Sequence, residues 1–380
     1  MSMSNENARY SIFEEEIKVL RVEEQKNITT YLNFSLPLCS VLWDKKKSPW
    51  FLEHFTNIYT IRQDNEYLWL DYLEKVHFID DIMECISVSL ESMKTITDIV
   101  SYIKEKINAG FYLILFVNSY YIKASASYQN YHNPLQLYIY GYDDRKALFY
   151  GIGFNTSSNF DKIVYTYEEV EQGFLSCINN NTEIFQKVWI KWYCCSLMKV
   201  KDVGEEYLCK PHLFINDIEN YIESKDLINK LRPEIVKERG NVAKYGISAF
   251  QEVINTLYEL NEGKFNMDYR YVHLIAERSK LMHEKIVYIS EHFNMENELK
   301  SLIDQYLEIS RELKKTRFIF IKGTLLQNEE VNIYAQLKDK KIIDMIISIY
   351  EKVIVMERKV LTEVCNIMKY NIPKYEHLMK

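Results

Sequence analysis

A long, continuous apolar run places the strongest constraint on what this chain can fold into. The run is "FYLILFVNSYYI", residues 111–122. It shows neither polar alternation nor helical spacing, which is typical of a strand buried on both faces. Just before it, residues 95–110 repeat apolar side chains at helical spacing, and Gly110 suits a C-terminal cap. We therefore expect a helix followed by the central strand of a sheet.

A hairpin is predicted next. The segments "LQLYIYGY" (135–142) and "ALFYGIGF" (147–154) are joined by a polar Asp-Asp-Arg-Lys turn. Residues 163–177 predict a strand that leads into a helix, where Thr166 and Glu169 fit a capping box. Residues 187–200 alternate as one further strand.

The first part of the chain gives weaker signals. Residues 33–61 predict a short helix, a basic turn and a second helix that Ser48 and Pro49 open. Residues 78–90 fit either an alternating strand or a short buried element, and the pattern leaves both open.

The pattern changes to helical spacing from about Tyr245 onward. The later segments lack strand breaks and are rich in good helix formers. One helix is also expected within residues 215–226. We therefore predict an α+β domain with a central antiparallel sheet over residues 1–235 and an all-helical domain over 236–380.

Composition excludes several classes of function. The net charge of -7 argues against a general nucleic-acid binder, since phosphate contacts need a basic face. No apolar run approaches the ~18–20 residues needed to span a bilayer, and the first residues lack a signal-peptide pattern. The seven cysteines have no paired spacing, which favours free thiols. We expect a cytoplasmic protein that binds no nucleic acid and spans no membrane.

Three residues could supply nucleophilic thiol chemistry. Such chemistry needs a cysteine on a helix, a histidine on a facing strand and a group that orients the histidine. Cys39 in the early helix, His132 before the hairpin and Asn155 at its end could form this set. The competing interpretation is stronger, because a lone helical cysteine is usually a small buried hydrophobe and a loop histidine is usually solvated.

Other polar residues have ordinary explanations. Asp143 and Asp144 are adjacent turn acids, which usually satisfy local backbone N–H groups. The charges within residues 276–285 are typical of a solvated helix face. His273 and His283 are not spaced to share a metal, and scattered glycines build no phosphate loop, so we expect neither metal nor cofactor.

Residues 107–174 resemble the butirosin biosynthesis protein H-like family. The resemblance rests on Gly110 before the apolar strand, "NSYYI", the "GYDD" corner, the "LFY" arm and "YTYEEVEQGF". "SPWFLEHFTNIY" (48–59) and the helical segments from Tyr245 onward look similar to the natural-product-cluster members. The resemblance implies a papain-like fold, a link to nonribosomal peptide or related secondary-metabolite biosynthesis, and thiol-dependent acyl transfer from a carrier protein.

The departures from the family concern its catalytic positions. In active relatives a histidine opens the strand that ends in "GYD", where this chain has Leu135. Relatives often carry an aspartate where this chain has Gly153. The nucleophile is expected near residues 33–36, where there is no cysteine, and Cys39 comes several residues late. Leucine cannot take a proton and glycine cannot orient a base, so the resemblance implies a degenerate site.

Three functions follow from these observations. The first is an accessory or binding protein, a pseudoenzyme that engages a carrier protein or a peptide intermediate. The second is an active thiol acyltransferase or cysteine peptidase that uses Cys39, His132 and Asn155. The third is a structural role for the helical domain, whose apolar stripes could pack on the first domain or form a homodimer.

Overall fold

The described chain divides into two compact units. The computed structural model of the protein describes residues 16–63, 67–74, 79–202, 207, 209–230, 243–265, 267–327 and 337–375. One unit, here called the sheet unit, comprises Met1–Glu24, Leu36–Trp43 and Ile82–Lys201. The other, here called the helical unit, comprises Gln25–Ser35, Asp44–Asp81 and Asp202–Lys380.

A seven-stranded antiparallel sheet forms the described core of the sheet unit. Its main path runs in the order β4 (Met83–Val88), β9 (Cys195–Val200), β5 (Tyr112–Asn118), β6 (Pro134–Asp143), β7 (Leu148–Phe154) and β8 (Phe160–Thr166). The short strand β1 (Ile17–Val19) pairs with the far end of β6, beyond the last residue that β5 pairs. Every residue of β5 is buried, so the predicted central strand is confirmed.

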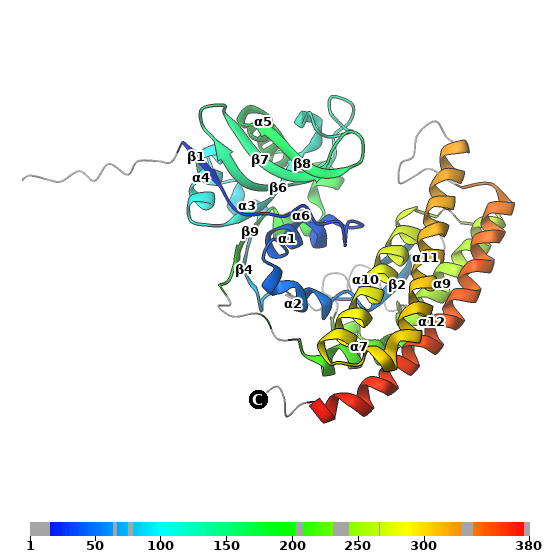
Figure 1. The fold of residues 1–380 in the computed structure, drawn as a ribbon. Coiled ribbons are helices and arrows are strands. Elements are labelled where there is room, and N and C mark those ends of the chain that lie inside the picture. Colours follow the sequence, from blue (N-terminus) through cyan, green and yellow to red (C-terminus); the bar gives the residue numbers. More distant parts are fainter. Residues whose placement is uncertain are drawn as a thin grey trace, which may run out of the picture. The chain divides into compact units, whose positions relative to one another are not determined.

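Helices cover one face of this sheet. The principal ones are α4 (Ile99–Asn108) and α5 (Tyr167–Ile178), and Figure 1 shows α5 lying over the strands. Leu113, Leu115 and Val117 of β5 pack in one apolar cluster with side chains from both helices. Shorter elements complete the unit: α3 (Leu90–Met93), α6 (Val188–Tyr193), η2 (Ser119–Tyr121), η3 (Glu183–Gln186) and the second half of α1 (Leu32–Val41).

Local sequence signals explain where the two main helices begin and end. Thr166 and Glu169 form the predicted capping box at the start of α5, with reciprocal side-chain to backbone bonds. Gly110 follows α4 with a φ of 86°, a left-handed conformation that glycine adopts without steric cost. Both predictions are therefore confirmed.

Long helices dominate the helical unit. They are α7 (Pro211–Ile222), α9 (Gly246–Asn261), α10 (Arg270–His292), α11 (Glu296–Gln327) and α12 (Lys340–Tyr375). Helices α10, α11 and α12 run side by side, as Figure 1 shows. The predicted C-terminal helical region is therefore confirmed. Short helical turns add α2 (Ser48–Leu52), η1 (Lys45–Lys47) and η4 (Ile228–Lys230).

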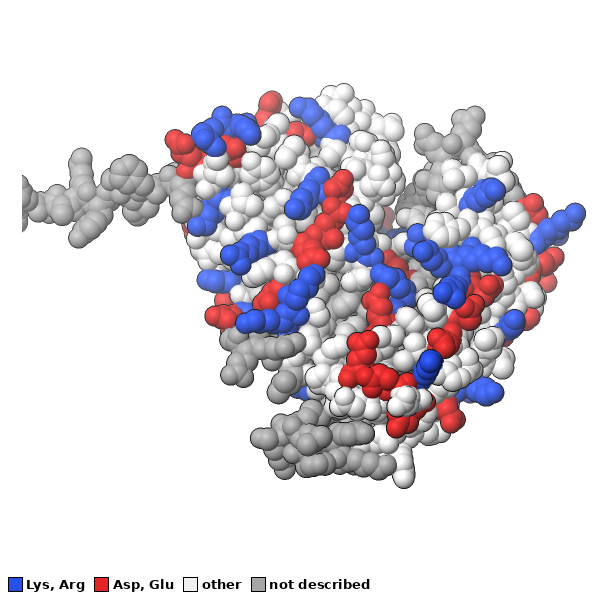
Figure 2. Space-filling view, viewed as in Figure 1, with Lys and Arg blue, Asp and Glu red and all other residues white. Residues whose placement is uncertain are grey.

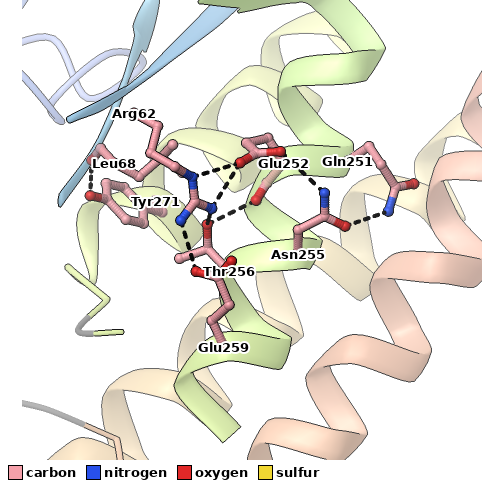
Figure 3. A network of polar contacts seen from close by, with 8 residues as sticks. All are labelled: Arg62, Leu68, Gln251, Glu252, Asn255, Thr256, Glu259 and Tyr271. Carbon is pink, nitrogen blue, oxygen red and sulfur yellow. Dashed lines mark hydrogen bonds and ion pairs between the residues drawn. The ribbon is translucent and has the colours of Figure 1, made fainter. Parts of the chain in front are cut away.

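A small three-stranded sheet lies within the helical unit. Its order is β10 (Ala243–Tyr245), β2 (Ile58–Gln63) and β3 (Tyr67–Tyr72). Arg62 of β2 ties this sheet to α9, since its guanidinium donates to Glu252 and Glu259 at 2.8 Å each (Figure 3). Tyr271 of α10 adds a bond from its hydroxyl to the Leu68 carbonyl of β3.

Two predicted elements were wrong in part. The second helix predicted within residues 33–61 ends at Leu52, and Ile58–Gln63 is the strand β2, because pairing with β3 and β10 decides its conformation. The strand predicted over residues 187–200 is only half strand. Its first half is the helix α6, which buries Ile190 and exposes Trp189 and Trp192. For residues 78–90 the sequence pattern left a strand and a short buried element as alternatives, and the structure has the strand β4 there.

The predicted domain boundary falls between residues 235 and 236, which lie outside the described residues. Residues 209–230, with α7, group with the helical unit. Within the described ranges, no helix combines the length and apolar character needed to cross a membrane.

Two glycines of β7 should respond differently to substitution by alanine. A Cβ on Gly151 would lie 2.5 Å from the Tyr138 carbonyl oxygen and 2.4 Å from the Tyr165 ring, whereas one on Gly153 would meet nothing closer than 3.5 Å. We expect Gly151→Ala to lower the free energy of unfolding by roughly 1–3 kcal/mol or more. Gly153→Ala should leave it nearly unchanged. Urea denaturation of both variants measures this, and an equal loss in both would contradict the expectation.

Candidate functional site

Cys39 is buried beside the middle of the large sheet. It lies in α1, after Pro37, and none of its side chain is exposed. Its carbonyl accepts a hydrogen bond from the Glu23 amide at 2.9 Å. Burial raises the pKa of the Tyr138 phenol well above its usual range, and Cys39 is among the neighbours that raise it further. The thiol therefore lies within electrostatic reach of Tyr138 of β6.

His132 belongs to a different polar set at the end of β5. Its Nδ1 lies 2.8 Å from Nδ2 of the buried Asn118, and its ring stacks on Tyr120 at 4.4 Å. Asn118 Nδ2 also donates to Ser176 Oγ of α5 at 2.9 Å, and its Oδ1 accepts from the Tyr120 amide. Since the Asn118 amide donates, Nδ1 of His132 acts as an acceptor.

The thiol and the imidazole are anchored at separate positions along the sheet. The Glu23 amide, which bonds the Cys39 carbonyl, lies two residues from Arg21, whose carbonyl accepts from the Tyr112 hydroxyl at the start of β5, whereas His132 bonds to Asn118 at the end of the same strand. At the usual rise of a strand, Tyr112 and Asn118 lie about 20 Å apart. Contact of Cys39 with His132 would need a large rearrangement of either.

Asn155 has a local structural role. Its Oδ1 accepts hydrogen bonds from the amides of Ser157 at 3.0 Å and Asn159 at 3.1 Å, which closes the turn between β7 and β8. This arrangement is the common use of asparagine in a turn. The amide oxygen that would orient a histidine is therefore occupied by backbone donors.

The positions at which the sequence resemblance implies a base and an acid, Leu135 and Gly153, hold residues without such chemistry. Leu135 pairs with Val117 and packs against the apolar cluster under α5. Strand side chains alternate between faces, so Gln136, and not Leu135, shares the face of Tyr138 and Cys39. The amide of Gln136 is no base at neutral pH. Gly153 has room for a small side chain, so close packing does not explain the absence of an aspartate there.

The other cysteines are poor nucleophiles with one exception. Burial raises the pKa of the thiols of Cys194, Cys209 and Cys365 to about 12, and it raises those of Cys177 and Cys195 still further. Because the thiolate is the reactive form, these groups are inert near neutral pH. Cys85 on β4 is exposed.

The helical unit contains a buried ion pair between α10 and α12. Arg278 Nη1 lies 2.7 Å from Glu357 Oε1, and the two side chains are 2% and 0% exposed. Tyr221 of α7 and Tyr306 of α11 donate to the same carboxylate. The guanidinium also stacks on the Tyr221 ring at 3.7 Å. Burial opposes the charge on Arg278, but Glu357 outweighs it and raises the pKa of the guanidinium.

A buried lysine lies two turns further along α10. Lys285 is fully buried, and its Nζ donates to the His54 carbonyl and, at 2.8 Å, to Thr56 Oγ1. Burial lowers its pKa from 10.5 to about 7, although Glu74 opposes the shift. Arg278 Nε donates to the Thr56 carbonyl at 2.8 Å. The two cations therefore hold the turn between α2 and β2.

A third charged residue of α10 fixes the segment that precedes α1. Glu277 is buried and accepts hydrogen bonds from the Thr29 amide at 2.7 Å and from both hydroxyls of Thr29 and Thr30. Burial alone would raise its pKa, but His273 and the threonines lower it. The interpretation of residues 276–285 as a solvated face was therefore wrong for Glu277, Arg278 and Lys285, since segments distant in sequence cover them.

Among the described side chains, no three His, Cys, Asp or Glu residues are arranged to hold a metal ion.

Sequence reasoning missed Asn118 and Ser176, which fix His132. A usable signal existed for Asn118, because it is the polar residue that ends the long apolar strand. Nothing local distinguishes Ser176 from other helical serines.

No family model and no curated protein matches the chain.

Removal of Arg278 should destabilise the protein strongly. Arg278→Met leaves the Glu357 carboxylate buried without its cation, which typically costs roughly 3–5 kcal/mol. The double variant with Glu357→Leu should recover much of this loss, because neither charge then remains. Lys264→Met, at an exposed pair with Glu262, should leave the free energy of unfolding almost unchanged. Chemical denaturation of the four proteins measures these differences.

Lys285 should make stability depend on pH. Its folded pKa of about 7 lies below its ordinary 10.5, so the unfolded chain binds more protons between these values. Stability should therefore rise with pH from about 7, by up to about 1.4 kcal/mol per pH unit. Denaturation of the wild type and Lys285→Met from pH 6 to 8.5 tests this. Parallel curves for the two proteins would refute it.

Proposed function

We propose that this protein is a non-catalytic accessory or binding protein on a papain-like scaffold, which serves peptide or secondary-metabolite biosynthesis. The single observation that carries the proposal is that Cys39 and His132 are anchored at opposite ends of β5. Thiol catalysis requires the two groups within hydrogen-bond reach. Here each group is fixed by its own neighbours, and Asn155 is engaged in a turn.

The papain-like character of the scaffold remains part of the proposal. It is supported by the order of elements: a helix carrying Cys39, then the buried central strand β5, then the hairpin of β6 and β7. The sequence resemblance to butirosin biosynthesis protein H-like proteins supports it as well. The resemblance implies a carrier protein or a peptide intermediate as the partner, bound by a protein that leaves the acyl group unchanged.

Incubation with a simple acyl thioester should leave Cys39 unmodified. The probe is an acyl-N-acetylcysteamine thioester, which transfers its acyl group to activated cysteines. Intact-mass and peptide mapping should detect no acyl adduct on Cys39 at neutral pH, because its thiol is fully buried and His132 is held by Asn118 at the end of β5. An adduct on Cys39 that disappears in His132→Ala would establish the active acyltransferase instead and overturn the proposal.

Thiol reactivity gives a second, independent measurement. In the native protein the exposed Cys85 should react rapidly with a chromogenic disulfide, while the six buried cysteines react only after unfolding in denaturant. Cys85→Ser should abolish the rapid phase. A rapid phase that persists in Cys85→Ser but is lost in Cys39→Ser would show an activated thiol at Cys39.

A further inference from the structure

Helix α11 separates its charges along its length. Its first half carries Glu296, Glu298, Asp304 and Glu308 beside only two cations, Lys300 and Arg311. The stretch from Leu313 to Gln327 contains no acidic residue but has the cations Lys314, Lys315, Arg317 and Lys322. Figure 2 shows Lys and Arg side chains gathered over the upper part of the visible face of the helical unit, with acidic side chains below them. A protein of net charge -7 thus presents a local basic surface.

The cations of this surface differ in their partners. Arg311 lies next to Glu308, and Lys315 lies 3.7 Å from Glu312, both within the helix. Lys314 and Lys322 are exposed and, among the described residues, have no carboxylate partner. The helix dipole does not explain them, because its effect is confined to the last turn and Lys314 lies well before Gln327.

Large apolar side chains share the exposed face with these cations. Phe318 is 51% exposed, and Leu325 and Leu326 are 49% and 75% exposed. Phe318 and its neighbours form an open hollow of about 340 Å³, lined by Arg311, Lys314, Lys315, Phe318, Ile319 and Lys322. A hollow with an apolar floor and a cationic rim fits an apolar anchor that is flanked by carboxylates.

This chemistry favours one kind of partner. A nucleic acid would meet the phosphate-repelling charge of the rest of the chain and offers no aliphatic group for the hollow. An anionic bilayer would also attract these lysines, so vesicle binding is one outcome of the test below. In a symmetric contact, a second copy would bring the same cations of its own α11 against this surface, which is unfavourable.

We propose that the C-terminal half of α11 is a docking surface for an acidic amphipathic helix of a protein partner. An aliphatic side chain of the partner sits in the hollow beside Phe318, and carboxylates one turn away face Lys314 and Lys322. This surface is independent of the thiol chemistry, so it stands whether or not Cys39 is active.

The test uses two synthetic helical peptides with the same leucine stripe, one flanked by glutamates and the other by lysines. Fluorescence anisotropy with the full chain should show binding of the acidic peptide only, weakened several-fold by raising the salt from about 50 to 300 mM. Lys314→Glu/Lys322→Glu should weaken binding roughly tenfold or more, and Phe318→Ser several-fold. Circular dichroism checks that the variants stay folded.

The matched control is Lys352→Glu/Lys359→Glu, which makes the same charge change on the exposed face of α12. It should bind within about twofold of the wild type. Equal weakening in both double variants, or no binding of the acidic peptide at about 100 µM, would overturn the proposal. So would phosphatidylglycerol vesicles that bind in its place, or self-association of the wild type that Lys314→Glu/Lys322→Glu abolishes.

Discussion

The buried pair of Arg278 and Glu357 is the interaction on which the helical unit depends. It joins α10 to α12, and the tyrosine hydroxyls that complete its shell come from α7 and α11. A buried charge is tolerated only when its partners are fixed in place. The carboxylate of Glu357 therefore helps to fix the relative positions of four helices. If Arg278 is lost, the charge of Glu357 stays buried without its cation.

The same helix organises the early segments that belong to the helical unit. Glu277 binds the backbone and hydroxyls of Thr29 and Thr30, while Arg278 and Lys285 bind the turn that contains Thr56. Chain segments far apart in sequence thus become parts of one unit. Hydrogen bonds, as well as apolar packing, therefore hold together the separate chain segments that make up this unit.

The sheet unit uses its polar groups differently. Asn118 holds His132 to α5, and Asn155 closes a turn, so both candidate groups serve the scaffold. Cys39 is fully buried, and its carbonyl is bonded to the Glu23 amide. This arrangement supports the proposal of a protein that acts by binding. On the described surface of α11, cations instead surround the exposed Phe318.

The sequence alone determined the elements whose signal is local. The strand β5, the hairpin, the capping box at Thr166 and the long C-terminal helices follow from apolar periodicity and capping, which need no distant partner. Tertiary structure decided the rest. Residues 58–63 form a strand because β3 and β10 pair with them, and Glu277, Arg278 and Lys285 are buried because distant segments cover them. A charged residue on a helix can be recognised as buried only when the residues that pair with it are known. Here those partners lie up to about 250 residues away in the sequence.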